Sequence, residues 1–425
     1  MSPLLRKILG MNWYLTGALA VLLLLGIEAI AIAGENNPSP SIQVAYKTQT
    51  NWILLGLVAY FVISFVDYKW IRWAAAPAML VGLALLVLAL VHGEEINDTK
   101  GWLTLGGLTF QPSQFAMGAA IIAASVALGE LRRLHKIFRQ PFVNLAMIGF
   151  LMGVPCLLVL SQGDVGSALV WLPVSASLCL VGNIPFRHIF LVVLAAMTVL
   201  PLFYFFGLND ARRSRIEVYL DMLNGRPVDI RGQGYSAYYA STAVGSGGWN
   251  GFGHKSRQNK DNPAMIATTD VTHDKSLDER KNSIHAQGLI SRTTAHTDYI
   301  FAVWAERFGF RGAMWLIALY SGVLAICLIV AYSSRDLTGR LVVTGVAALI
   351  FAHVFQNIGM NILLTPITGI PLPFISYGGT FVVVILSMLG LVQSVWVHRD
   401  PDLQEEPEPQ KEVDGVQNLL NREAR

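Results

Sequence analysis

Long stretches of this sequence carry no charged side chain. Residues 73–91, 141–163 and 312–334 contain no Asp, Glu, Lys or Arg, and each is about as long as a membrane crossing requires. Continuous apolar runs are typical of helices, whereas strands of a membrane barrel alternate apolar and polar residues. Only 14% of the 425 residues are charged, about half the share of an average soluble domain. The sequence therefore predicts an all-α, polytopic membrane protein.

Ten apolar segments are predicted to span the membrane. They lie near residues 12–33, 51–66, 73–92, 110–129, 141–160, 164–182, 188–207, 299–332, 341–363 and 374–397. One set of short connections and termini contains eleven cations: Arg6, Lys7, Lys69, Arg72, Arg132, Arg133, Lys136, Arg139, Arg187, Arg335 and Arg340. The short loops on the other side contain only Lys47 and Lys100. Because cationic loops stay in the cytoplasm, we expect both termini inside and the long loop, about 207–298, outside. Residues 1–398 would form one transmembrane domain, and residues 399–425 a disordered polar tail.

Charge and cysteine placement limit the possible functions of this membrane protein. The formal net charge of +3 lies largely in loops, so it indicates orientation and gives no case for nucleic-acid binding. Cys156, Cys179 and Cys327 lie inside apolar segments without metal-ligand spacing, and we interpret them as core packing. Arg6 and Lys7 precede an apolar run as in a signal peptide, but no convincing cleavage site follows. This favours a retained first helix.

The long polar loop ends in His296-Thr297-Asp298, at the mouth of a predicted span. An Asp in a partly desolvated place holds its proton more tightly and becomes a better base near neutral pH. Glu306 lies eight residues further along the same helical face. Two interpretations of Asp298 stay open at this point, a catalytic base and a helix cap.

Other ionisable residues at membrane depth are also functional candidates, because charge is costly there: Glu28, Asp164, Arg307, Arg311 and His353. Asp164 either serves a site or caps a helix. We favour a satisfied core histidine for His353.

The polar loop contains two further features. Residues 243–253 are rich in glycine but match neither the dinucleotide fingerprint nor a P-loop, so we expect a sharply turning backbone or close approach of a bulky ligand. Arg212, Arg213 and Arg215 form a basic cluster that suits a pyrophosphate headgroup or is ordinary flanking charge. The last external connection, residues 364–380, contains three prolines and three glycines, and a broken segment at membrane depth marks a site.

Taken in order, these motifs are specific. They include Gln111-Pro112-Ser113, Gln162-Gly163-Asp164, Arg215-Ile216, Ser241 through Gly248, His296 through Ala302, Gln356 through Met360 and the run from Thr365 to Gly379. The chain resembles the SEDS proteins (shape, elongation, division and sporulation), the group of RodA and FtsW, over nearly all of residues 10–398.

The resemblance implies a ten-helix bacterial inner-membrane glycosyltransferase that polymerises lipid II into peptidoglycan, beside a class B penicillin-binding protein and other elongation or division machinery. Asp298 matches the family's catalytic aspartate. By analogy it takes the proton from the acceptor 4-hydroxyl, and undecaprenyl pyrophosphate leaves with its charge stabilised by Arg215 or by a divalent cation (Mg²⁺ or Mn²⁺). We assign no metal ligands. The short N-terminus favours the elongation branch.

The same resemblance assigns substrate contact to residues of the matched motifs: Arg215, Ser241, Ser246, Gly247, Gly248, His296, Thr297, Glu306, Asn357, Pro371, Ser376, Tyr377 and Gly378. The chain departs from the family pattern at Gln114 and Met117, where an ion pair is usual, and at Ala240, Thr293 and Thr294. The loop between Gly253 and His296 also looks longer than usual, and we expect an accessory role for about 255–292.

Two rival functions share these features. A flippase for the lipid-linked precursor would also use broken helices and intramembrane charges, and a scaffold would only recruit a penicillin-binding protein. Because the polar candidates cluster at the outer face, the sequence favours the enzyme.

Overall fold

The computed structural model describes residues 3–35, 37–96, 99–105, 108–191, 194, 210–224, 226, 234–253 and 283–399. Its long helices are α2 (Trp13–Gly34), α4 (Ala45–Phe65), α5 (Ile71–His92), α6 (Pro112–Val126), α8 (Pro141–Ser161), α9 (Val165–Val181), α14 (Ile300–Tyr332), α15 (Leu337–Asn361) and α16 (Gly379–Val397). Shorter helices are α1 (Pro3–Leu9), α3 (Pro40–Gln43), α7 (Arg132–Leu134), α11 (Asp210–Leu223) and α12 (Tyr235–Ser246). The turns η1 (Tyr68–Trp70), η2 (Ala127–Leu131) and η3 (Lys136–Arg139) complete the helical elements of the described ranges.

Eight helices in the described ranges are long and apolar enough to cross a membrane, and α9 is a shorter apolar helix. These nine coincide with nine of the predicted spans. The remaining predicted span, 188–207, lies largely outside the described residues, as does the tail from residue 400 onward, so the count of ten stays a prediction. The all-α, multi-span architecture is confirmed.

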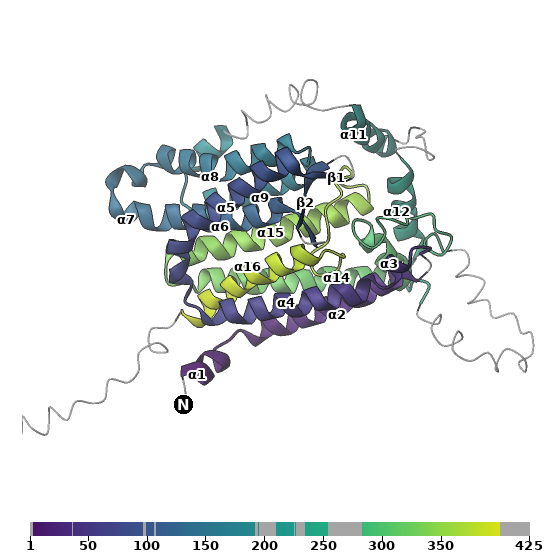
Figure 1. Ribbon diagram of the computed structural model, residues 1–425, viewed down its shortest axis with the longest axis horizontal. Coiled ribbons are helices and arrows are strands. Elements are labelled where there is room, and N and C mark those ends of the chain that lie inside the picture. Colours follow the sequence, from purple (N-terminus) through teal and green to yellow (C-terminus); the bar gives the residue numbers. More distant parts are fainter. Residues whose placement is uncertain are drawn as a thin grey trace, which may run out of the picture.

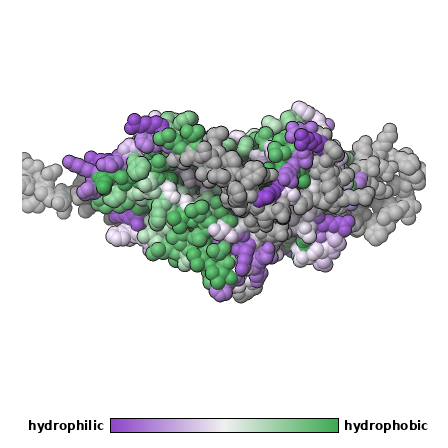
Figure 2. All heavy atoms as spheres, turned by 90° about the horizontal axis from the view of Figure 1, so that it is seen from above, coloured by the Kyte–Doolittle hydropathy of each residue, from purple (hydrophilic) through white to green (hydrophobic). Residues whose placement is uncertain are grey.

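The bundle is elongated, with α7 near one end and α11 and α12 near the other (Figure 1). α15 lies inside, packed against α14, α9 and α6, while α16 packs along α4. Small residues permit these close approaches: a Cβ added to Gly56 of α4 would meet the side chain of Leu386 at 2.6 Å. Figure 2 shows a broad hydrophobic area on one face of the bundle, as expected where helices face lipid.

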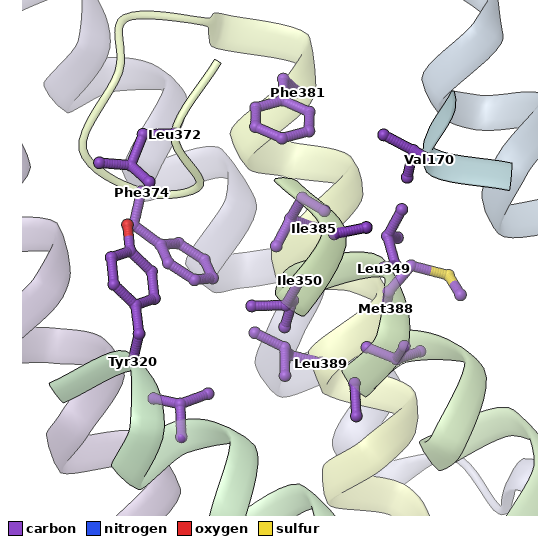
Figure 3. Close-up of a cluster of buried hydrophobic side chains, with 14 of the residues drawn as sticks. Val170, Tyr320, Leu349, Ile350, Leu372, Phe374, Phe381, Ile385, Met388 and Leu389 are labelled. Atoms are coloured by element: carbon purple, nitrogen blue, oxygen red, sulfur yellow. The ribbon is translucent and has the colours of Figure 1, made fainter. Parts of the chain in front are cut away.

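The buried core joins α14, α15 and α16 beneath the connection between α15 and α16. In Figure 3, Ile350 of α15 lies beside Ile385 and Leu389 of α16. Tyr320 of α14 points toward the non-helical segment that contains Leu372 and Phe374. Gln114 and Met117, where the family pattern has an ion pair, are both buried in α6. Since both charges are absent, no buried charge is left unpaired there.

A small antiparallel sheet lies at the end of the bundle near α12 (Figure 1). Its strands are not among the elements predicted from the sequence. It comprises β1 (Glu94–Ile96), β2 (Thr99–Leu105) and β3 (Leu108–Phe110). β2 is tied to the loop between α8 and α9, since the Lys100 amide donates to the Gln162 carbonyl at 3.0 Å. β1 and β3, of three residues each, give too few alternating residues for a pattern to be recognised.

Candidate active site

Asp298 lies where the polar loop enters the bundle, directly before α14. Its backbone carbonyl accepts hydrogen bonds from the side-chain amides of Asn357 and Asn361 on α15, at 2.9 and 3.3 Å. The Asn357 amide also donates to the carbonyl of Ile370 at 2.7 Å. Two asparagines four residues apart share one helix face, so α15 fixes both Asp298 and the connection that follows. The N-cap of α14 is Tyr299, without a side-chain cap. The cap interpretation of Asp298 is therefore wrong.

The connection between α15 and α16, residues 362–378, is held against the His296-Thr297-Asp298 segment. The Tyr377 amide donates to the His296 carbonyl at 2.9 Å, and the Ser376 hydroxyl donates to the Thr297 carbonyl. The Ser376 oxygen also accepts from the Leu372 amide at 2.8 Å. Prolines in this connection prevent a helix and leave carbonyl groups to be satisfied from outside.

Two further helices anchor the same connection. Tyr320 on α14 donates its hydroxyl to the Pro373 carbonyl (Figure 3), and the Gly378 amide donates to Gln49 of α4 at 3.1 Å. The predicted broken segment is thus confirmed as a non-helical connection, and most of its residues 370–376 are buried in the protein.

The carboxyl group of Asp298 is half-buried and protonates more readily than a free aspartate. Burial, the largest effect, raises the pKa of Asp298 from 3.8 to about 6, against the lowering effects of the Thr297 hydrogen bond and of Arg215. A Cβ built on Gly369 would lie 3.5 Å from the Asp298 Oδ2, so the connection passes close to this carboxylate. A carboxylate with such a pKa is ionised at neutral pH and is still basic enough to take a proton.

Arg215, from the predicted basic cluster, acts electrostatically on both Asp298 and Tyr299. It lies on α11, so the structure brings α11 to the start of α14. The Tyr219 hydroxyl of α11 donates to the Leu364 carbonyl at 2.9 Å, which attaches the same helix to the proline-rich connection. The side chain of Arg212 lies outside the described set.

His296 lies beside this carboxylate segment and is buried, with its ring 5.4 Å from the ring of Tyr377. Burial lowers the pKa of the His296 imidazole, so the ring is neutral near pH 7. Its Nδ1 has no hydrogen-bond partner in the described part of the chain.

Asp164 approaches the site from another helix. It caps α9, accepting from the Ser167 amide at 2.8 Å, and its other oxygen accepts from Gln111 at 2.7 Å. The predicted capping role is confirmed. Its charge also contributes to the raised pKa of Asp298, so two carboxylates from different helices face the same region.

The residues around Asp298 do not form a ready metal site. Both Asp164 oxygens already accept hydrogen bonds, and the described residues contain no cluster of three or more His, Cys, Asp or Glu that could hold an ion. The divalent cation implied by the family resemblance therefore stays a prediction, and we derive no step through a metal.

Glu306, two turns into α14, holds the returning end of the long loop. Its two carboxylate oxygens accept from the backbone amides of Ile284 and His285, at 2.5 and 3.0 Å. Ser246 of α12 contributes a longer bond at 3.4 Å. Glu306 lies about 12 Å from Asp298 along the helix, and its oxygens are engaged by the loop. This arrangement favours a structural role over the predicted substrate contact.

The glycine-rich stretch turns sharply, as predicted, and the group that it approaches is α14 itself. α14 breaks at Gly309, which has φ 66° and ψ −167°, and a Cβ there would lie 2.3 Å from the Gly251 amide nitrogen. Backbone bonds join the two segments, including Phe310 N to the Gly248 carbonyl at 2.8 Å. Gly247 likewise packs on the Ala305 carbonyl. No ligand is needed to explain these glycines.

The remaining predicted residues are spread more widely. Ser241 lies in α12 and donates to the Tyr238 carbonyl, and Pro371 lies in the connection beside Ile370. The Nδ1 of His353 bonds to the Leu349 carbonyl, but its Nε2 has no partner in the described ranges, so this core histidine is only half satisfied. All three cysteines are free, and Cys179 and Cys327 are buried in the core, as predicted.

Comparison with known proteins identifies the family. The FtsW/RodA/SpoVE family model, described as a cell cycle protein, matches residues 6–272 and 287–400. The chain belongs to the FtsW/RodA/SpoVE family. The unmatched residues, 273–286, fall within the loop segment predicted to be inserted, and include the two amides that bind Glu306.

Individual relatives in this family cover most of the chain. It is 29% identical to a probable peptidoglycan glycosyltransferase FtsW of Hydrogenovibrio crunogenus, over 90% of this chain and 91% of the relative. It is also 29% identical to the peptidoglycan glycosyltransferase MrdB of Escherichia coli K12, over 82% and 84%.

Solved structures show the same fold. A chain of a peptidoglycan synthase complex that coordinates polymerization and crosslinking matches with a TM-score of 0.71 and 27% identity, over 92% of this chain and 99% of that one. The rod shape determining protein RodA of Thermus thermophilus matches with a TM-score of 0.61 and 27% identity, over 92% and 97%.

Proposed function

We propose that this membrane protein is a peptidoglycan glycosyltransferase that joins lipid-linked disaccharide units of lipid II into glycan strands. Family relatives named peptidoglycan glycosyltransferases support the reaction class. The single observation that carries the assignment in this chain is the Asp298 carboxyl, half-buried and with its pKa raised to about 6. A base of this strength suits deprotonation of a sugar hydroxyl near neutral pH.

In the proposed reaction, the ionised Asp298 takes the proton of the acceptor 4-hydroxyl as that oxygen forms a bond to the anomeric carbon of the donor. The bond from the anomeric carbon to the pyrophosphate oxygen breaks, and undecaprenyl pyrophosphate leaves with the electron pair. Arg215, close enough to influence Asp298, would stabilise the anionic leaving group. One direct displacement predicts inversion at the anomeric carbon.

Hydrogen bonds from Asn357 and Asn361 on α15 fix the position of the Asp298 backbone. Asn357 and Asn361 hold the backbone carbonyl of Asp298, so the side chain is free to meet substrate. Positioning of a reacting group within a fraction of an ångström is a large part of catalysis. The Ser376 and Tyr377 bonds add the proline-rich connection to the same rigid unit.

We further propose that both termini are cytoplasmic and that the α11–α12 end faces the outside of a bacterial inner membrane. The distribution of eleven cations against two supports this orientation. A class B penicillin-binding protein is the proposed partner, because a structural relative belongs to a complex that couples polymerization and crosslinking.

The test is glycan synthesis from purified lipid II, with and without the cognate penicillin-binding protein. Asp298→Ala should reduce polymerisation by a factor of about 10² to 10⁴. Glu95→Gln, which removes an exposed carboxyl on β1, should leave the rate unchanged. Polymer formed by Asp298→Ala at the wild-type rate would remove the catalytic assignment. A wild type that transports lipid II but makes no polymer with its partner would favour a flippase.

A further inference from the structure

A recess of about 250 Å³ opens at the end of the bundle away from Asp298. Three segments that are distant in the sequence surround it: the turn η1 with the start of α5, the η2–α7 segment, and the start of α15. Five charged side chains line it, namely Lys69, Arg72, Glu130, Arg133 and Asp336. The proposed glycosyl transfer uses none of them.

The two acidic residues of the recess are already engaged in holding its walls together. Glu130 accepts from the Thr338 hydroxyl at 3.3 Å and pairs with Arg133 at 3.9 Å. Asp336 caps α15 by accepting from the Gly339 amide at 2.8 Å. Glu130 therefore joins the η2–α7 segment to α15, and Asp336 is engaged in capping α15.

Lys69 and Arg72 are different, because neither forms an ion pair in the residues that the structure describes. The backbone amide of Lys69 bonds to Asp67, but its ammonium group has no such partner. Arg72 lies 5.8 Å from the Trp73 ring, its one described side-chain interaction. Both side chains are exposed and are the free donors of the recess.

The recess lies at the level where a membrane has its polar headgroups. α5, a candidate span, begins at Ile71, and Trp70 and Trp73 on either side of it are 67% and 69% exposed. Tryptophans gather at the boundary between hydrocarbon and water. A ligand that entered the recess from the side would have its polar part beside Lys69 and Arg72 and its apolar part in the bilayer.

We propose that this recess binds the phosphate headgroup of an anionic phospholipid. The guanidinium of Arg72 and the ammonium of Lys69 supply donors to the phosphate oxygens, and basic pockets between transmembrane helices are suited to such headgroups. Arg133, already paired with Glu130, lines the same recess. A lipid bound here would contact the segments at the starts of α5 and α15 at once and so brace this end of the bundle.

The experiment uses the full-length protein in detergent, with bound lipid counted by native mass spectrometry after addition of phosphatidylglycerol or phosphatidylcholine. The double variant Lys69→Gln, Arg72→Gln removes the two free cations. Its matched control, Lys136→Gln, Arg139→Gln, removes the same charge from exposed positions of η3 outside the recess. Thermal unfolding of all three proteins shows whether they remain folded.

The wild type and the control should bind phosphatidylglycerol about tenfold more tightly than phosphatidylcholine, and the recess variant should lose that preference. Equal loss in the control would overturn the site, since general surface charge would then explain binding. Absence of any preference in the wild type would also overturn it. Displacement of phosphatidylglycerol by inorganic phosphate at equal concentration would overturn a lipid as the source of the phosphate.

Discussion

The raised pKa of Asp298 predicts that this carboxyl reduces the stability of the protein while serving its function. The pKa rises from 3.8 to about 6 on folding, and each pKa unit corresponds to about 1.36 kcal/mol. The full shift would amount to about 3 kcal/mol, which partial exposure to solvent reduces to about 1–2 kcal/mol. Asp298→Asn keeps the shape and removes the charge, so it should stabilise the protein by about that amount at pH 7.5.

The sign of the pH dependence follows from linkage. The folded protein binds the Asp298 proton more tightly than the unfolded chain does, so the carboxyl causes no loss of stability below about pH 4. Stability is lost as the pH rises from about 4 to about 6 and stays lower above that range. The advantage of Asp298→Asn should therefore grow between pH 4 and pH 6 and then remain constant.

Thermal unfolding in detergent at pH 4.5 and pH 7.5 measures this difference. At pH 7.5 the midpoint of Asp298→Asn should lie about 1–3 °C above that of the wild type, with the gap smaller at pH 4.5. Glu95→Gln serves as the control, because this exposed carboxyl should show no such gap. An Asp298→Asn protein that is less stable at pH 7.5, or equally shifted at both pH values, would refute the reasoning.

Three other predictions concern the residues that hold the site. Glu306→Ala leaves the part-buried amides of Ile284 and His285 without acceptors, so the free energy of unfolding should fall by about 2–4 kcal/mol. Hydrogen exchange of those amides should accelerate, and unchanged exchange would contradict the role of Glu306 in holding this loop. Gly309→Ala places a Cβ 2.3 Å from the Gly251 backbone in a conformation restricted to glycine, and it should lower the stability of the protein by about 2 kcal/mol or more. Gly322→Ala, on the same helix with open space around it, should be neutral or stabilising. The thermal unfolding midpoints of the two variants test this, and equal midpoints would exclude the helix break as the cause. Asn357→Ala removes two hydrogen bonds that hold Asp298 and the proline-rich connection and should lower kcat by about tenfold or more with little change in KM; loss confined to KM would indicate a substrate contact instead.

Much of the architecture could be predicted because membrane helices follow from local composition. A segment in lipid must satisfy its own backbone and be apolar along its length, so α8 and most of α5 are visible as charge-free runs. The non-helical connection of residues 362–378 was also predictable, because Pro366, Pro371 and Pro373 lie too close together for a continuous helix, whereas α5, α8 and α9 each accommodate one internal proline. The sheet β1–β3 was missed, since β1 and β3 have only three residues each and depend on pairing with β2 rather than on a pattern of their own.

The site was only partly predictable. The position of Asp298 at the mouth of a span suggested a base, and family resemblance chose it over a cap. The second asparagine that holds Asp298, Asn361, could have been found from its spacing of four residues after Asn357, which puts both on one helix face. The role of Glu306 could not be found in this way. The Ile284 and His285 amides that donate to its carboxylate lie in a loop, and no local sequence pattern predicts where that loop runs.

The sequence by itself thus determined a multi-span helical bundle and a polar segment that ends at an acidic residue. It also determined which end of the bundle carries most of the Lys and Arg residues. Tertiary structure decided which polar groups meet. It brought α15 amides to the Asp298 carbonyl, Arg215 and Asp164 to its carboxylate, and a glycine-rich loop to the break in α14. The physical reason is the distance over which each effect acts. Hydrophobicity and helix breaking act within each segment, whereas a pKa shift or a long-range hydrogen bond depends on atoms that only packing brings together.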